Sequence, residues 1–288
     1  MKLADCVVLV TGGSSGLGAA VSLMAWEAGA RVLIADRAAP RDDNPLRLRD
    51  PQGERWLWQA TDVSDEAQAS AAVNQALTRF GRLDVLVNAA GVAAVEKVHG
   101  RDGPHQLASF QKVIQVNLLG SFNMMRLAAA AMLASPARPG SNEVDSRGVI
   151  VNTASIAAFD GQMGQVAYAA SKGGVVAMTL PAARDLARDR IWVMTVASGV
   201  FYMPMMASLP EAVAGPETAL PSSSIPASTT SPSLVTVTGD DSVAPLMVMV
   251  TTCETTLPLL SVTETVYFSV TVWPAASACT AADELFRL

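Results

Sequence analysis

The sequence predicts a doubly wound α/β domain with a parallel sheet, and three observations support this prediction. Apolar runs typical of strands alternate with runs typical of helices through residues 1–199. The strand-like runs are continuously apolar, which is typical of strands that are covered on both faces. The first of these runs leads through a glycine-rich turn into a helix. Strand, helix and strand in repetition favour a doubly wound sheet.

The expected elements follow in order along the chain. The strand-like runs are CVVLVTG, RVLIAD, RWLWQATDV, LDVLVNAAG, GVIVNTAS and IWVMTVASG. Between them we expect a first helix that ends at Gly29, a second over AQASAAVNQALTRFG, one long helix over ASFQKVIQVNLLGSFNMMRLAAAAML, and a helix that contains AYAASKGG. Residues 38–54 are polar, which predicts a connection that replaces or disrupts a helix, and residues 136–147 predict a surface loop.

Composition and charge exclude several classes of function. Half of the 288 residues are hydrophobic, and the net charge of −6 favours no binding to nucleic acid or to acidic membranes. The three cysteines, Cys6, Cys253 and Cys279, have no metal-ligand or disulfide spacing. With no cleavable leader in MKLADCVVLVTGG, we expect a cytoplasmic protein. The two histidines, His99 and His105, lie in a polar stretch, so we expect no metal site and no serine–histidine hydrolase.

The segment TGGSSGLG, residues 11–18, predicts a phosphate-binding turn. It follows a strand and opens a helix, and its glycines are Gly12, Gly16 and Gly18. Glycine lets the backbone turn tightly and approach a pyrophosphate, while a helix N-terminus presents free N–H groups. The alternative is a turn whose glycines serve packing alone. The strand before it and the helix after it favour nucleotide binding.

Residues at the ends of the next strands extend this predicted nucleotide site, because ligands bind at the carboxyl edge of such sheets. Asp36 ends the second strand, where a carboxylate accepts hydrogen bonds from the adenosine ribose and repels a 2′-phosphate. It therefore favours NAD over NADP, although Arg37 and Arg41 lie nearby and a strand-end cap is the alternative. Asp62 follows the third strand, within reach of an adenine amino group. The small residues of NAAG, residues 88–91, leave room for the dinucleotide.

The segment AYAASKGG, residues 167–174, predicts a catalytic pair. Tyr168 and Lys172 lie four residues apart in an expected helix, on one face and about 6 Å apart along its axis. A free tyrosine has a pKa of about 10, so a base at neutral pH needs a cation that favours phenolate. Ser155 ends the preceding strand, where its hydroxyl can hold a substrate oxygen. Asn117 lies within the long helix and needs a partner, which a local kink that exposes a carbonyl to water would supply.

These motifs in this order resemble the short-chain dehydrogenase/reductase family over residues 6–199. The family has the T-G-x-x-x-G-x-G turn, an N-A-G-type segment and an Asn, Ser, Tyr, Lys tetrad. The resemblance implies a Rossmann-type sheet, a nicotinamide cofactor and a homo-oligomer, usually a tetramer or dimer. The stretches GVIVNTASIAAFDGQMGQVAYAASKGGVVAMTLPAARDLA and GVFYMPMMASLPE are similar to the type-2 3-hydroxyacyl-CoA dehydrogenases. That group oxidises short-chain or branched 3-hydroxyacyl-CoA, and some members act on hydroxysteroids.

The resemblance implies a role for each matching residue. Ser155, Tyr168 and Lys172 would be catalytic, and Asn117 would support a proton relay. Gln162 would steer the substrate together with Ser155 and Tyr168, with ordinary loop polarity as the alternative. The cofactor contacts predicted from the turn and from the resemblance are Gly12, Ser15, Gly16, Leu17, Gly18, Asp36, Asp62, Val63, Asn88, Ala89, Gly91, Tyr168, Lys172 and Phe201.

The resulting expectation is an NAD-dependent oxidoreductase that acts on a secondary alcohol, a 3-hydroxyacyl-CoA. Tyr168 phenolate would take the hydroxyl proton while hydride passes to NAD, Ser155 would hold the oxygen, and Lys172 would lower the tyrosine pKa and anchor the nicotinamide ribose. Two alternatives stay open: an NADPH-dependent 3-oxoacyl-thioester reductase, and a nucleotide-binding protein that has lost turnover. The second is raised by Ser198 in place of the family's proline and by Met203 in place of a threonine that binds the carboxamide.

The chain divides into two regions of different composition. Residues 1–212 are expected to form the NAD-binding domain, and residues 213–288 an atypical tail rich in Ser, Thr, Pro and Val. All but one of the 20 lysines and arginines precede residue 191, whereas eight of the 26 acidic residues follow it. The tail is a divergent module, disordered sequence or the product of a shifted reading frame, and the scarcity of basic residues favours the last. Glu254 and Glu264 interrupt its apolar runs, so we expect no membrane span.

Overall fold

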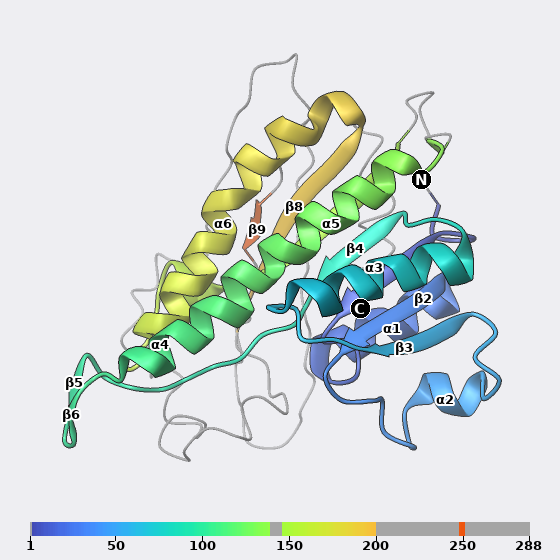
Figure 1. Cartoon of the computed structure of the whole chain (residues 1–288). Coiled ribbons are helices and arrows are strands. Elements are labelled where there is room, and N and C mark those ends of the chain that lie inside the picture. Colours follow the sequence, from blue (N-terminus) through green and yellow to red (C-terminus); the bar gives the residue numbers. More distant parts are fainter. Residues whose placement is uncertain (1, 139–145, 200–247, 251–288) are drawn as a thin grey trace, which may run out of the picture.

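A computed structural model of the chain describes residues 2–138, 146–199 and 248–250, and it confirms the doubly wound α/β class (Figure 1). The main sheet has the strand order β3-β2-β1-β4-β7-β8-β9, and every neighbouring pair is parallel. Its strands are β1 Val7–Thr11, β2 Arg31–Asp36, β3 Trp56–Ala60, β4 Val85–Asn88, β7 Gly148–Ser155, β8 Ile191–Ser198 and β9 Val248–Val250.

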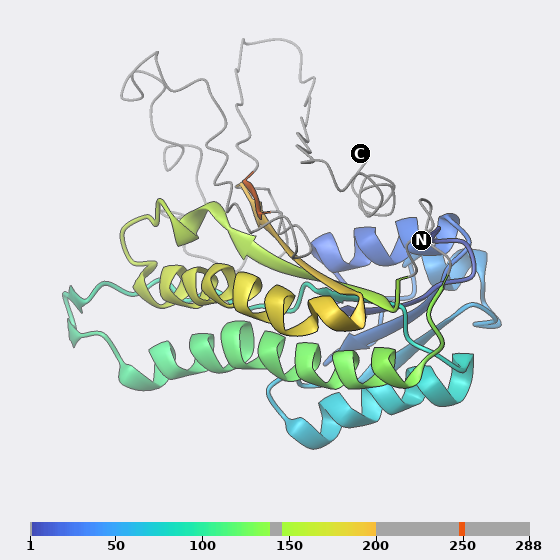
Figure 2. The ribbon, with the colours of Figure 1, turned by 90° about the horizontal axis from the view of Figure 1, so that it is seen from above.

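Helices lie on both faces of the sheet, with α1 on one side and α3, α5 and α6 on the other (Figure 2). The helices are α1 Gly16–Glu27, α2 Pro45–Arg49, α3 Glu66–Phe80, α4 Leu107–Ile114, α5 Gly120–Ala134 and α6 Val166–Leu186. Short 3-10 turns, Ile156–Ala158 and Ala187–Asp189, flank α6, and a small hairpin of β5 His99–Gly100 and β6 Gly103–Pro104 precedes α4.

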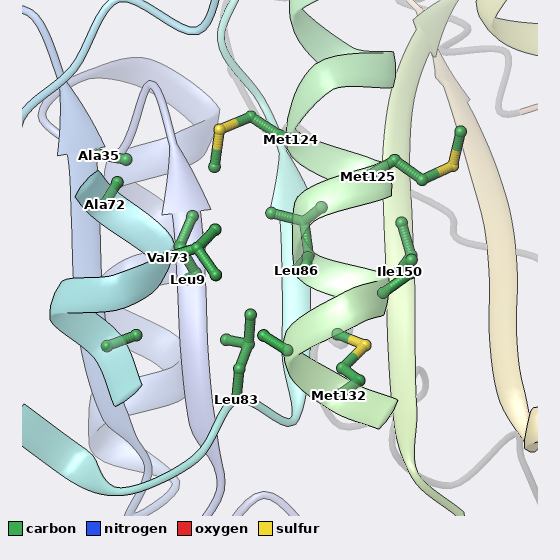
Figure 3. Close-up of a cluster of buried hydrophobic side chains, with 14 of the residues drawn as sticks. Leu9, Ala35, Ala72, Val73, Leu83, Leu86, Met124, Met125, Met132 and Ile150 are labelled. Carbon is green, nitrogen blue, oxygen red and sulfur yellow. The ribbon is translucent and has the colours of Figure 1, made fainter. Parts of the chain in front are cut away.

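The two-sided core explains why the strands are apolar at every position. In β1, Leu9 faces the helices α3 and α5, while Val8 and Val10 face α1, and all three are fully buried. Figure 3 shows Leu9 and Leu86 of the sheet beside Met124 of α5. A strand that packs on both faces has no solvent side, so its sequence shows no alternation.

The predicted long helix is present but interrupted. α4 and α5 are joined by a π-helical turn, Gln115–Leu119, in the middle of which lies Asn117. Within the described residues, Leu107–Ala134 has the length and apolar composition of a membrane span, yet half of that stretch is buried in the domain. Burial against the sheet is the behaviour of a core helix in a globular protein.

Three connections differ in detail from expectation. The first helix ends at Glu27, two residues before Gly29, and the polar stretch 38–54 contains the short helix α2. Residues 139–145 of the predicted loop lie outside the described residues. The same holds for the predicted tail except β9, which pairs in parallel with Thr195–Ala197 of β8. The division at residue 212 therefore stays a prediction.

Candidate active site

The glycine-rich turn packs so closely on the segment after β4 that side chains do not fit. Gly12 has φ +66°, and a Cβ there would lie 2.8 Å from the Cα of Ala90. A Cβ on Gly18 would lie 2.2 Å from the carbonyl oxygen of Gly12. Ser15, the N-cap residue of α1, makes no side-chain capping bond. The turn thus leaves the start of α1 open toward the cleft, as a phosphate-binding turn requires.

Asp36 at the end of β2 braces this turn. Its carboxylate accepts hydrogen bonds from the backbone N–H groups of Ser14 (3.0 Å) and Ala38 (3.2 Å). The Ser14 hydroxyl in turn donates to the Ala38 carbonyl at 2.7 Å. The carboxylate lines the cleft, so it is held in place at the position where a ribose would lie.

Asp62 lies after β3 on the same edge of the sheet. The Ser64 hydroxyl donates to its carboxylate at 2.6 Å and the Ser64 N–H donates at 3.0 Å. These bonds, the hydroxyl first, hold the pKa of Asp62 below its ordinary value against the opposing effect of burial. Asp62 is therefore an acceptor at neutral pH, consistent with the predicted contact to an amino group.

The predicted cofactor residues come together along one cleft at the carboxyl edge of the sheet. Those that line it are Gly12, Ser15, Gly16, Leu17, Gly18, Asp36, Asp62, Val63, Ala89, Gly91, Tyr168 and Lys172. The cleft is also lined by residues that were not predicted as contacts: Ala35, Arg37, Thr61, Ala90, Val92, Val116, Thr153, Ala154 and Ser198. Most of these are immediate neighbours of predicted residues at strand ends, so proximity in sequence was the available signal.

Asn88 is a predicted cofactor contact whose side chain lies inside the domain. The side chain is 2 % exposed and does not line the cleft. Its amide nitrogen donates to the Ser121 carbonyl (3.1 Å) and to Oδ1 of Asn152 (2.9 Å), the residue in register on β7. Both partners of this nitrogen lie inside the domain, so Asn88 ties β4 to β7 and α5.

Tyr168, Lys172 and Ser155 converge as the sequence predicts. The Tyr168 and Ser155 hydroxyls share a hydrogen bond, which joins α6 to the end of β7. The Lys172 ammonium lies 5.7 Å from the centre of the Tyr168 ring and donates to the Thr153 carbonyl at 2.7 Å. These three side chains are the expected arrangement for holding a substrate oxygen and moving its proton.

Burial shifts the pKa values of both α6 residues toward their neutral forms. It raises the pKa of Tyr168, and the hydrogen bond from Ser155 offsets only part of this rise. It lowers the pKa of Lys172 from 10.5 to about 8. The net shift of the Tyr168 pKa is therefore upward rather than the expected lowering, because desolvation of the phenol outweighs the hydrogen bond with Ser155.

Asn117 finds its partner in the loop after β4. Its Oδ1 accepts from the Val92 N–H (2.8 Å), and its Nδ2 donates to the Val92 carbonyl (2.9 Å) and to the Ser171 hydroxyl (3.0 Å). The predicted helix kink is the π-helical turn, and the carbonyl of Asn117 accepts a hydrogen bond from the Ser121 hydroxyl at 2.7 Å.

Two predicted residues are not part of the described arrangement. Gln162 is exposed in the loop before α6, where its N–H donates to Gln165 Oε1 at 3.0 Å, and it does not line the cleft. Phe201 lies outside the described residues, as does Met203. Among the described residues, no cluster of three or more His, Cys, Asp or Glu side chains could hold a metal ion.

Comparisons with known proteins agree with this geometry. A family profile described as short chain dehydrogenase matches residues 6–214. The chain is 45% identical over 211 residues to 3-hydroxyacyl-CoA dehydrogenase type-2 of Drosophila melanogaster, covering 73% of this chain and 80% of the relative. It is 44% identical over 212 residues to the human protein of that name, covering 72% and 77%. The crystal structure of 3-hydroxyacyl-CoA dehydrogenase type-2 from Mycobacterium avium superposes with a TM-score of 0.64 at 38% identity, covering 72% of this chain and 80% of that one.

Proposed function

Because the chain belongs to the short-chain dehydrogenase family, we propose that its substrate is a 3-hydroxyacyl-CoA, oxidised with NAD to the 3-oxo thioester. The chain is an oxidoreductase of that family, which uses a nicotinamide cofactor. The observation that carries the proposal is that Tyr168 and Lys172 line the cleft that begins at the glycine-rich turn, with the Ser155 hydroxyl hydrogen-bonded to Tyr168. The names of the similar proteins support the thioester as the substrate class.

The residues present fit a nicotinamide dinucleotide. Gly12, Gly16 and Gly18 line the cleft at the start of α1, and Asp36 holds its carboxylate at the same cleft. These residues would hold the adenosine and pyrophosphate, and Lys172 would hold the nicotinamide ribose. A bound NAD supplies the acceptor for the hydride that leaves the carbinol carbon with its electron pair.

The chain's own residues handle the proton. Tyr168 as phenolate accepts the proton of the substrate hydroxyl, while the Ser155 hydroxyl donates a hydrogen bond to the same oxygen. At neutral pH Lys172, with its pKa of about 8, is mostly ammonium. That charge and the Ser155 hydrogen bond favour phenolate and oppose the effect of burial on Tyr168. In the reverse direction Tyr168 returns the proton to the oxygen of the ketone.

The preference for NAD over NADP is supported by the braced carboxylate of Asp36, which would repel a 2′-phosphate. Arg37 also lines the cleft and is the feature that favours the NADPH-dependent alternative. Asp36→Asn is the suitable test, because its amide oxygen keeps one acceptor for the Ser14 and Ala38 N–H groups. Asp36→Ala would remove the charge and the brace together. We expect wild type to favour NADH and Asp36→Asn to reduce that preference; a wild type that favours NADPH would contradict the choice.

A homo-oligomer is supported by large apolar side chains that are exposed on the π-helical turn and α5. Leu119, Phe122 and Leu133 are 47%, 50% and 42% exposed. Exposed apolar groups of this size commonly mark contacts between proteins. Light scattering tests this point: we expect an assembly that Phe122→Glu weakens, and a monomeric wild type would contradict it. The cytoplasmic location stays a prediction from the N-terminal sequence.

The activity is tested by following NADH absorbance with acetoacetyl-CoA. We expect wild type to oxidise NADH and Tyr168→Phe to lose about 10³-fold in kcat, the usual range for a general acid or base. NADH binding by Tyr168→Phe, measured by calorimetry, should persist. Binding of NADH by wild type without turnover on this substrate or on other 3-oxo thioesters would instead support a nucleotide-binding protein that has lost turnover.

A further inference from the structure

We propose that Ser171 is a positioning residue that holds Asn117, and with it the loop after β4, in register with the helix that carries Tyr168 and Lys172. Its effect on turnover rests on the proposed function, whereas its effect on the geometry of the site does not. Ser171 lies on α6 between the two reacting side chains and is itself fully buried. It does not line the cleft, so it would act through its neighbours.

The Ser171 hydroxyl connects two elements through two hydrogen bonds. It donates to the Tyr168 carbonyl at 2.7 Å, within α6, and it accepts from Nδ2 of Asn117 at 3.0 Å, across to the π-helical turn. A serine that bonds back to its own helix commonly shifts the local path of that helix. Here the turn that this bond closes begins at Tyr168.

Asn117 uses its whole amide in this arrangement. One acceptor bond and one donor bond hold both polar groups of the Val92 backbone, and the second N–H of Nδ2 is taken by Ser171. Asn117 is 0 % exposed, so water does not readily replace a lost partner. Without the Ser171 hydroxyl, a buried N–H is left unpaired and the amide is driven to seek another orientation.

The orientation of Asn117 matters because Lys172 lies beside it. A Cβ added to Gly91 would lie 3.3 Å from Oδ1 of Asn117 and 3.8 Å from Nζ of Lys172, so both atoms border the same small space. Gly91 and Val92 also line the cleft. A rotated Asn117 amide would therefore disturb the wall of the cleft and the surroundings of the ammonium at once.

Thr179 provides a matched comparison on the same helix. Its hydroxyl is also fully buried and donates to the Val175 carbonyl at 2.8 Å, four residues back. Its other neighbour is the hydroxyl of Thr195 on β8, and neither threonine lines the cleft. Loss of the Thr179 hydroxyl should therefore affect stability without affecting the reacting groups.

The first test compares Ser171→Ala with Thr179→Val in the reduction of acetoacetyl-CoA. We expect kcat to fall about tenfold in Ser171→Ala, the effect of one lost buried hydrogen bond, with a smaller change in KM for NADH. Thr179→Val should keep the wild-type kcat. Ser171→Cys, which keeps the volume and a weak hydrogen bond, serves as a second variant and should lose less. Wild-type kcat in folded Ser171→Ala or an equal loss in Thr179→Val would overturn the inference.

A double-mutant cycle separates positioning from simple packing. If Ser171 acts through Asn117, then Asn117→Ala already removes what Ser171 provides. We expect the pair Asn117→Ala/Ser171→Ala to have nearly the kcat of Asn117→Ala alone. Independent, multiplying losses in the double variant would contradict the assigned role.

A measurement that does not need turnover tests the role of Ser171 separately from the proposed function. The chain has three tyrosines, so Tyr202→Phe/Tyr267→Phe leaves Tyr168 as the phenol seen by ultraviolet titration. In this background Ser171→Ala should lower the pKa of Tyr168 toward its ordinary value, because a loosened turn admits water, and Thr179→Val should not. An unchanged pKa in Ser171→Ala would contradict the inference. A wild type without turnover would contradict the proposed function alone, since this titration would still decide the role of Ser171.

Discussion

Two buried charged side chains lie near opposite ends of the parallel strands. One has charged partners and the other has none among the described residues. Asp84, just before β4, is 0 % exposed, and it accepts hydrogen bonds from the guanidinium groups of Arg82 (2.8 Å) and Arg138 (2.8 Å) and from the Val7 N–H (2.9 Å). Lys172, on α6, is 5 % exposed and has no acidic partner among the described residues. Its hydrogen bond goes to a neutral carbonyl.

The difference teaches where the chain uses a buried charge for structure and where it uses one for chemistry. A buried ion can serve structure when charged partners and hydrogen bonds offset the cost of its burial. A buried ammonium without a counter-ion is destabilised as a cation, which lowers the pKa of Lys172 to about 8. Such a group changes charge near physiological pH, a property that proteins use at reactive sites.

Lys172→Met should have the largest effect, a loss of activity without a loss of stability. We expect kcat to drop about 10³-fold, since the cation that favours the phenolate is gone. The free energy of unfolding should stay level or rise, because an unpaired buried charge is replaced by an apolar side chain of similar length. Steady-state kinetics and urea denaturation measure the two effects, and exposed Lys112→Met is the control. A Lys172→Met variant that is less stable than wild type but retains its activity would contradict the view that Lys172 serves chemistry rather than stability.

Asp84→Asn should show the opposite pattern. Two partly buried guanidinium groups lose their counter-charge, so the free energy of unfolding should fall by about 3 to 5 kcal/mol. The kcat of the folded fraction should match wild type, because Asp84 lies at the far edge of the sheet from the cleft. Asp42→Asn, which breaks an exposed pair with Arg47, should leave the urea midpoint unchanged. A stable but inactive Asp84→Asn would contradict this assignment.

The contrast also marks what the sequence could and could not predict. Tyr168 and Lys172 were predictable because their spacing in one helix is a local signal. The pairing of Asp84 with Arg138 joins residues 54 positions apart, and no local pattern reports it. The carbonyl of Thr153 that holds Lys172 belongs to the main chain and leaves no mark in residue type.

The turn and the strand ends show the same limit. The glycine-rich turn and the carboxylate of Asp36 were predicted from a strand, a turn and a helix in sequence. Asn88 was predicted as a cofactor contact from its place at a strand end, and its side chain faces the interior. A polar residue that ends a buried strand can face the cleft or the interior, and only the neighbouring strand, with Asn152 in register, decides between them. The bonds that Ser171 makes to Asn117 and Tyr168 were missed, because they depend on how helices pack.

The third prediction is that the unpaired charge of Lys172 makes the free energy of unfolding depend on pH. The pKa of Lys172 lies at about 8 in the folded protein and at 10.5 as its ordinary value, so the unfolded chain binds the proton more tightly between these values. Stability should therefore rise with pH from about 8 to 10.5 and be lower by up to roughly 3 kcal/mol below that window. Denaturation of wild type and Lys172→Met across this range measures the difference. A difference that does not vary with pH would contradict the shifted pKa.

Gly91→Ala should have the smallest effect, and it tests whether the space beside Asn117 and Lys172 tolerates a methyl group. Its methyl group would lie 3.3 Å from Oδ1 of Asn117, which must move slightly, and 3.8 Å from Nζ of Lys172, which is an ordinary contact distance. We expect kcat to fall about threefold, well under the 1.4 kcal/mol that a tenfold change represents. Gly100→Ala is the control, since a Cβ there meets no atom within 4 Å. Equal kcat in both variants would show that this space tolerates a methyl group.

The most direct test of the central claim is an NMR titration of the Lys172 ε-carbon. The chain has four lysines, and the spectrum of Lys172→Met assigns the signal. A buried ammonium without a counter-ion should titrate with a midpoint near the pKa of about 8. A midpoint for Lys172 at the ordinary lysine value of 10.5 would contradict the claim that this site holds an uncompensated buried charge.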